Sequence, residues 1–123
     1  QWVHAHSVQA GRNSFDAVLN AWSAAKSEGN MNRLLGFYAP DFQSHKKKPL
    51  SEWATVLQAE SQALKGRPVH LKDKAYLRWT DSADTMVVTF GEVAEGARTG
   101  PIKRQYWTRR GQQWQIFFEG VIG

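Results

Sequence analysis

The hydrophobic period of the 123-residue chain changes once, near Pro68, and this change limits the fold more than any other feature. Before Pro68, apolar residues such as Phe15, Leu19 and Trp22 recur at the spacing of one helix face. After it, apolar and polar residues alternate, which is typical of strands that bury one face. We therefore expect an α+β domain in which helices cover one face of an antiparallel sheet.

Capping and helix-breaking residues give the expected element boundaries. Asn13 or Ser14 suits the start of the first helix, Gly29 its end, and Asn30 the start of a second helix that ends near Pro40. The first and third helices are expected over residues 14–28 and 51–65, and the strands over residues 69–79, 85–94, 102–109 and 113–122. Residues 1–13 are expected to form a tail or linker. Residues 14–123 are expected to form a single domain, too small for a second core.

Composition narrows the classes of function. The chain has no cysteine, which excludes disulfides, thiolate nucleophiles and cysteine-based zinc sites. His4 and His6 have a spacing that can share a metal on a strand, but in a terminal tail we predict no metal site, and we predict no cofactor. The net charge of +5 includes a lysine run at residues 46–48, which a solvated surface explains, and no nucleic-acid-binding motif accompanies it. No apolar run approaches the ~20 residues of a membrane-spanning helix.

Several short motifs together resemble one protein superfamily. They are Trp22, then Glu28-Gly29-Asn30, Phe37-Tyr38-Ala39-Pro40-Asp41-Phe42, Ser51-Glu52-Trp53 and the closing Gly111-Gln112-Gln113-Trp114-Gln115-Ile116. Over about residues 14–120 the chain resembles the nuclear transport factor 2-like (SnoaL-like) superfamily. Within it, the chain is most similar to the C-terminal accessory domains of bacterial L,D-transpeptidase and L,D-carboxypeptidase cell-wall proteins.

This resemblance implies a cone in which three N-terminal helices pack on a bent antiparallel sheet of four or more strands. It also implies a periplasmic or cell-envelope location. The catalytic cysteine on which a transpeptidase domain depends has no counterpart here, because the chain contains no cysteine. The resemblance is therefore to the accessory domain and not to the enzyme.

The superfamily carries its pocket inside the cone, and alternation along the strands predicts which side chains face it. In the last strand, Trp114, Ile116 and Phe118 share one face. Members that act on small molecules often carry histidine where Phe118 stands, so the resemblance favours passive binding over catalysis. The candidate pocket residues are Trp22, Tyr38, Trp53, Glu60, Arg104, Tyr106 and Phe118.

Arg104 is the charged residue that we predict to face inward. A buried guanidinium needs an acidic partner, and Glu60 could supply one within the chain. The alternative is an anionic ligand, such as the stem-peptide carboxylate of a peptidoglycan fragment.

The outer face of the sheet supports a second interpretation. It offers the large apolar side chains of Trp107, Phe117 and Val121, which could form a homodimer contact or a contact with another protein. A protein-interaction role therefore stays open beside ligand binding.

An enzyme is the alternative to both. A small enzyme of the ketosteroid isomerase, dehydratase or polyketide cyclase type would need a carboxylate base near a tyrosine. Asp41 with Tyr38, or Glu60 with Tyr106, are the available pairs. We predict no catalytic residue, and a non-catalytic accessory domain that binds an anionic cell-wall ligand or a protein partner.

Overall fold

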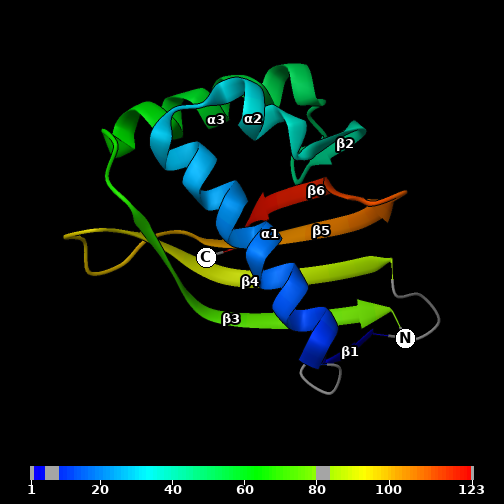
Figure 1. The fold of residues 1–123 in the computed structure, drawn as a ribbon. Coiled ribbons are helices and arrows are strands. Elements are labelled where there is room, and N and C mark those ends of the chain that lie inside the picture. The colour runs from blue at the N-terminus through cyan, green and yellow to red at the C-terminus, as the bar shows by residue number, and fades with distance from the viewer. Residues whose placement is uncertain (1, 5–8, 80–83, 123) are drawn as a thin grey trace.

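The structure is a computed structural model that describes the backbone of residues 2–4, 9–79 and 84–122 and the side chains of residues 15–78 and 84–122. Figure 1 shows three helices on one side of a curved sheet. In chain order the elements are β1 (Trp2–His4), α1 (Gln9–Glu28), α2 (Met31–Gly36), β2 (Tyr38–Ser44), α3 (Leu50–Leu64), β3 (Val69–Trp79), β4 (Thr85–Ala94), β5 (Ile102–Arg110) and β6 (Gln113–Val121).

The described strands form one six-stranded sheet in the order β1-β3-β4-β5-β6-β2. The pairs from β3 to β6 are antiparallel, β1 lies antiparallel to β3, and β2 lies parallel to β6. The predicted α+β architecture is confirmed, and the predicted boundaries of β3 and β4 agree with the structure. Those of β5 and β6 each differ by one residue at the C-terminal end.

The prediction that all helices precede the sheet is wrong. The sheet begins with β1, inside the predicted tail, and β2 lies between α2 and α3. A three-residue strand such as β1 is too short to show alternation. β2 contains Pro40, which disfavours a strand in the middle of a sheet, but β2 lies at the edge, where proline is tolerated.

The helix ends follow their predicted capping residues at the junction of α1 and α2. α2 ends at Gly36, before the predicted end near Pro40, and α3 begins at Leu50, one residue before the predicted start, without a side-chain capping bond. Asn30 caps α2, since its side chain accepts a hydrogen bond from the Arg33 backbone N–H at 3.2 Å, and Gly29 before it adopts a φ of 75°. α1 begins at Gln9, so the predicted caps Asn13 and Ser14 lie inside the helix. The described helices include none that is long and apolar enough to cross a membrane.

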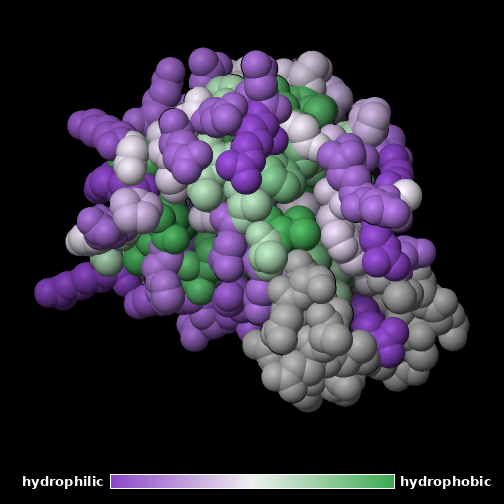
Figure 2. All heavy atoms as spheres, viewed as in Figure 1, coloured by the Kyte–Doolittle hydropathy of each residue, from purple (hydrophilic) through white to green (hydrophobic). Residues whose placement is uncertain are grey.

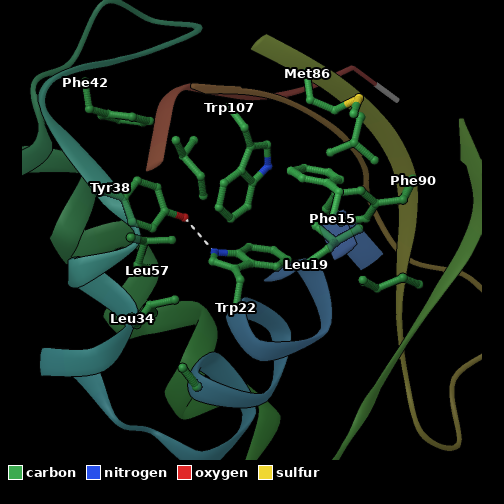
Figure 3. Packing of buried hydrophobic residues seen from close by; sticks show 14 of the residues in the cluster. Phe15, Leu19, Trp22, Leu34, Tyr38, Phe42, Leu57, Met86, Phe90 and Trp107 are labelled. Carbon is green, nitrogen blue, oxygen red and sulfur yellow. Dashed lines mark hydrogen bonds between the residues drawn. The ribbon is translucent and has the colours of Figure 1, made fainter. Parts of the chain in front are cut away.

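The core fills the space between α1 and the concave face of the sheet. The stripe of α1 carries Phe15, Leu19 and Trp22, all fully buried. The ring of Phe15 meets Trp107 of β5 edge-on at 5.4 Å, and Trp22 meets Phe90 of β4 at 5.7 Å. Figure 3 shows these aromatic rings converging from α1 and the sheet, with Tyr38 beside them. The inside of the cone is therefore packed by the chain's own side chains.

Candidate functional site

A β-bulge in β6 decides which side chains enter the cone. Tyr106 pairs with Phe118, whereas the next residue of β5, Trp107, pairs with Ile116, so β6 holds one extra residue between them. Beyond the bulge, the inward-facing residue comes one position later than strict alternation predicts, and Glu119 is fully buried. The prediction that Phe118 faces the pocket is therefore wrong: its ring lies 5.1 Å from that of Tyr106, on the outer face.

The inward face of β5 is also opposite to the predicted one. Lys103, Gln105 and Trp107 are fully buried, and Arg104 between them is exposed. The predicted inward placement of Arg104 and Tyr106 is wrong, and so is the predicted exposure of Trp107. Two of the three inward side chains are polar, so hydrophobic alternation in β5 does not distinguish its faces.

The other predicted interface residues keep an outward position. Phe117 is half-buried, with its ring 5.9 Å from that of Tyr106, and Val121 is 40% exposed. Whether they bind a partner stays a prediction, as does any binding of an anion by Arg104.

Glu119 lies at the centre of a buried hydrogen-bond network. Its Oε1 accepts hydrogen bonds from the Tyr38 hydroxyl at 2.9 Å and from Trp53 Nε1 at 2.8 Å. Its Oε2 accepts from Gln105 Nε2. The Tyr38 hydroxyl in turn accepts from Trp22 Nε1 at 3.1 Å, the dashed line of Figure 3. All three groups around the carboxylate donate to it, so its buried oxygens are satisfied by hydrogen bonds.

Three predicted pocket residues, Trp22, Tyr38 and Trp53, are thus brought together, but as parts of a closed core. Each is at most 4% exposed. Their polar atoms are bonded to one another or to Glu119. No ligand can reach this network without unpacking the core.

Beside this network, four charged side chains alternate in a ring. Lys26 Nζ lies 2.6 Å from Glu60 Oε1 and 2.9 Å from Glu92 Oε2. Lys103 Nζ lies 2.8 Å from Glu60 Oε1 and 2.7 Å from Glu92 Oε1. We call these four residues the charged ring. The side chain of Glu60 is 30% exposed, and the other three are at most 7% exposed, so the ring meets solvent at Glu60.

The charges of Glu92 and Lys103 are fixed by their neighbours in the ring. Burial would raise the pKa of Glu92, but the ammonium groups of Lys26 and Lys103 outweigh it and hold that pKa below its ordinary value. Burial would lower the pKa of Lys103, but the carboxylates of Glu92, Glu119 and Glu60 outweigh it and raise that pKa. Lys103 is therefore a permanent cation at neutral pH and is unsuited to act as a nucleophile or base.

Three members of the ring, Lys26, Glu60 and Glu92, form the charged floor of a pocket of about 240 Å³ at the end of the cone, between α3 and the loop after β4. We call it the rim pocket. In Figure 2 green hydrophobic atoms gather at the left of the view, where Figure 1 places the start of β3 and the loop after β4. The lining residues are Lys26, Glu60, Ala63, Leu64, Val69, Glu92, Ala94, Ala97, Thr99, Gly100 and Pro101.

Of the predicted pocket residues, only Glu60 lines the rim pocket. Sequence reasoning missed Lys26 and Glu92, although both carried a signal. Lys26 continues the apolar stripe of α1 one turn beyond Trp22, and Glu92 follows Val88 and Phe90 on the inward face of β4. A charged residue on an otherwise apolar face is expensive to bury alone, which predicts a partner of opposite charge.

The predicted enzymatic pairs do not form. Asp41 pairs with Arg110 at the surface at 3.1 Å, whereas Tyr38 is buried against Glu119. Glu60 belongs to the charged ring, and Tyr106 lies on the outer face of the sheet. Within the described residues no cluster of His, Asp and Glu could hold a metal ion. His6 lies outside the described residues, and the described part of His4 is limited to its backbone in β1.

Comparison with known proteins places this geometry in a family. A family model described as the Cds6 C-terminal NTF2-like domain matches residues 14–120. The chain belongs to this family. The NTF2-like superfamily expected from the sequence is thereby confirmed, and no curated protein matches the chain.

Solved structures share the NTF2-like fold at low identity. Bd1075 from Bdellovibrio bacteriovorus is 15% identical with a TM-score of 0.72, and the match covers 89% of this chain and 39% of that protein. The helical cell shape determining protein Pgp2 from Campylobacter jejuni, as its K307A mutant, is 15% identical with a TM-score of 0.66, covering 89% and 40%. An NTF2-like protein of unknown function from Pseudomonas putida is 14% identical with a TM-score of 0.68, covering 92% and 86%.

The first two proteins are much longer than their matching parts. This NTF2-like domain spans about two fifths of the length of each. At these identities the likeness shows the fold alone.

Proposed function

We propose that the chain is a non-catalytic accessory domain of a bacterial cell-envelope protein and that its rim pocket binds a peptidoglycan fragment. The observation that carries the proposal is the division of the cone into a sealed interior and an open end. Glu119 and its donors are buried in the interior, and the pocket opens where Glu60 reaches solvent.

The sealed interior argues against catalysis. A general acid or base must reach the proton that it transfers, directly or through one water molecule. Glu119 is 0% exposed and accepts three hydrogen bonds from the protein, so it is inaccessible to a substrate. The carboxylates of the charged ring are held by two ammonium groups instead of facing a tyrosine or histidine.

The cell-wall context of the proposal rests on the sequence resemblance, and one structural neighbour is compatible with it. Pgp2 is described as a helical cell shape determining protein, and its part that resembles this chain is two fifths of its length. An accessory domain attached to a cell-wall enzyme, in the periplasm or envelope, fits that arrangement. The link to L,D-transpeptidases and L,D-carboxypeptidases is part of this proposal.

The proposal is tested by co-sedimentation of the purified chain with isolated peptidoglycan sacculi. Ala63→Trp places a large side chain in the rim pocket from an exposed position of α3, and we expect it to remove the chain from the pellet. Ala59→Trp is the matched control, because Ala59 is exposed on the same helix and does not line the pocket. Soluble muropeptides incubated with the chain should keep their masses.

Two results would overturn the proposal. One is a wild-type chain that stays in the supernatant, which removes the cell-wall ligand. The other is a change in muropeptide mass that Ala63→Trp abolishes, which would make the pocket an active site.

A further inference from the structure

We infer that the rim pocket selects a primary aliphatic ammonium group and rejects a carboxylate, an inference that rests on the proposed binding role of this pocket. It concerns the chemistry of the ligand group and reverses the sign of charge expected from the sequence.

The charge at the pocket floor favours a cation. Two ammonium groups, on Lys26 and Lys103, face the carboxylates of Glu60 and Glu92. Of these four side chains, Lys26, Glu60 and Glu92 line the pocket, and Lys103 does not. The lining therefore carries two carboxylates and one ammonium group, an excess of one negative charge. An entering cation reduces that excess, and an entering carboxylate increases it.

The ammonium groups of both lysines donate mainly to carboxylates of the protein itself. Lys103 Nζ contacts both oxygens of Glu60 and Oε1 of Glu92. Lys26 Nζ contacts Glu60 Oε1 and Glu92 Oε2 and lies 5.4 Å from the centre of the Trp22 ring. An ammonium group has three N–H donors. Lys103 therefore uses its donors inside the protein. Lys26 uses two of its three donors there, and its side chain is 2% exposed, so the lysines leave one buried donor at most for an external carboxylate.

Glu60 keeps a hydrogen-bond acceptor that faces the pocket opening. A carboxylate has about four lone-pair sites. Glu60 Oε1 receives both lysines, but Oε2 receives only the contact from Lys103 at 3.0 Å. Because the Glu60 side chain is also the exposed member of the ring, Oε2 is placed to accept a hydrogen bond from a ligand ammonium.

The side walls of the rim pocket determine the size and polarity of the group that can bind there. Their apolar members are Ala63, Leu64, Val69, Ala94, Ala97 and Pro101. The volume of about 240 Å³ is below the ~300–1,000 Å³ of pockets for drug-sized ligands. The pocket therefore fits a group as large as one amino-acid side chain. An aliphatic stem would lie in it with its ammonium group at the floor, and the rest of the ligand would lie outside.

The inference is tested with two probes of equal length, n-pentylammonium and pentanoate, by NMR titration at neutral pH. We expect n-pentylammonium to shift the methyl signals of Leu64, Val69 and Ala97, and pentanoate to leave them in place at the same concentration. Equal or tighter binding of pentanoate, or no shift with n-pentylammonium, overturns the inference.

Substitutions in the pocket then test where the ammonium group of the ligand binds. Glu60→Gln, which keeps an acceptor for the lysines, should weaken n-pentylammonium binding at least about tenfold, and Glu52→Gln, exposed in the first turn of the same helix, should not. If Glu60→Gln does not fold, Ala63→Trp against Ala59→Trp supplies the same contrast. Unchanged binding in the pocket variant contradicts the assignment.

The two proposals fail in different ways. Sacculus binding that depends on Ala63, with no preference for the ammonium probe, leaves the proposed function intact and removes this inference. Ammonium binding without sacculus binding removes the proposed ligand and keeps the selectivity.

Discussion

The Lys103 ammonium lies 2.7 Å from the Glu92 carboxylate on the neighbouring strand, and both side chains are buried beneath the rim pocket. Neither charge would be stable there alone, because the desolvation of a single buried ion costs several kcal/mol. Together with Lys26 and Glu60 they join α1, α3, β4 and β5 at the open end of the cone. The charged ring is thus a structural element, and three of its members form the floor of the proposed binding site.

Removing one cation from the ring should destabilise the domain strongly. Lys103→Met leaves three carboxylates near one ammonium group, and breaking a buried ion pair from one side costs about 3–5 kcal/mol. Arg104→Met, one residue along the same strand but exposed, should change the free energy of unfolding by no more than about 0.5 kcal/mol. Urea denaturation of the two variants measures the contrast. Equal effects would contradict the inward placement of Lys103.

At acid pH, the free energy of unfolding should depend on the protonation of Glu92. Its pKa in the folded state lies below its ordinary value of 4.5, so in acid the unfolded chain binds the proton more readily than the folded one. This contribution to stability is present above that ordinary value and is lost as the pH falls through the lower folded pKa. Urea titrations between pH 3 and pH 6 measure the loss. A variant with Glu92→Gln should lose less stability over this range, and a slope as steep as that of the wild type would contradict the prediction.

At alkaline pH, the free energy of unfolding should depend on the protonation of Lys103 and Tyr38. Both pKa values are raised in the folded state above ordinary values of 10.5 and 10.0, Tyr38 first by burial and then by the Glu119 carboxylate. The unfolded chain therefore loses these protons first, and stability decreases once the pH rises above about 10. Tyr38→Phe removes one of the two contributions and should make the decrease shallower. A free energy of unfolding that is flat from pH 9 to pH 11 would contradict this.

Glu119→Gln tests the buried network. The amide places a donor where the carboxylate accepts hydrogen bonds from Tyr38, Trp53 and Gln105, so at least one buried donor loses its acceptor. We expect a loss of about 1–3 kcal/mol in the free energy of unfolding. Glu95→Gln, in the exposed turn after β4, is the control and should be neutral. A neutral Glu119→Gln would mean that water already satisfies the network.

Gly100 should tolerate no side chain. A Cβ atom at this position would lie 1.9 Å from the backbone oxygen of Glu92, so the loop after β4 would have to move away from the charged ring. We expect Gly100→Ala to lower the melting temperature and to weaken ligand binding in the rim pocket. Gly96→Ala, with open space around its own Cβ but a φ of 87°, should cost stability without affecting the pocket.

The main elements of the fold were predictable from sequence, because strong periodicity and capping residues marked the helices and the four long strands. β1 was not predicted, and β2 was expected only as a short extended piece within residues 41–48, for physical reasons: one is three residues long, and the other is an edge strand that contains Pro40. Neither feature produces an alternating pattern that a sequence can show.

The site was predicted less well, because its inward side chains are polar. Lys103, Gln105 and Glu119 occupy positions where alternation would call for apolar residues. The bulge at Phe117 then reverses the phase of β6 half-way along, and no turn residue marks it. Of the predicted site residues, Glu60 lines the rim pocket, and its binding of a ligand stays a prediction. The partner expected for it, Arg104, proved to be its inward neighbour Lys103.

Hydrogen exchange of the tryptophan indoles tests most directly that the cone interior is sealed. Trp22, Trp53 and Trp107 donate their indole N–H groups to buried partners, whereas Trp114 is half-buried. We predict that the first three N–H groups exchange only with global unfolding and that Trp114 exchanges much faster. Exchange of Trp22 and Trp53 as fast as that of Trp114 would show an interior open to water and would contradict a sealed, non-catalytic cone.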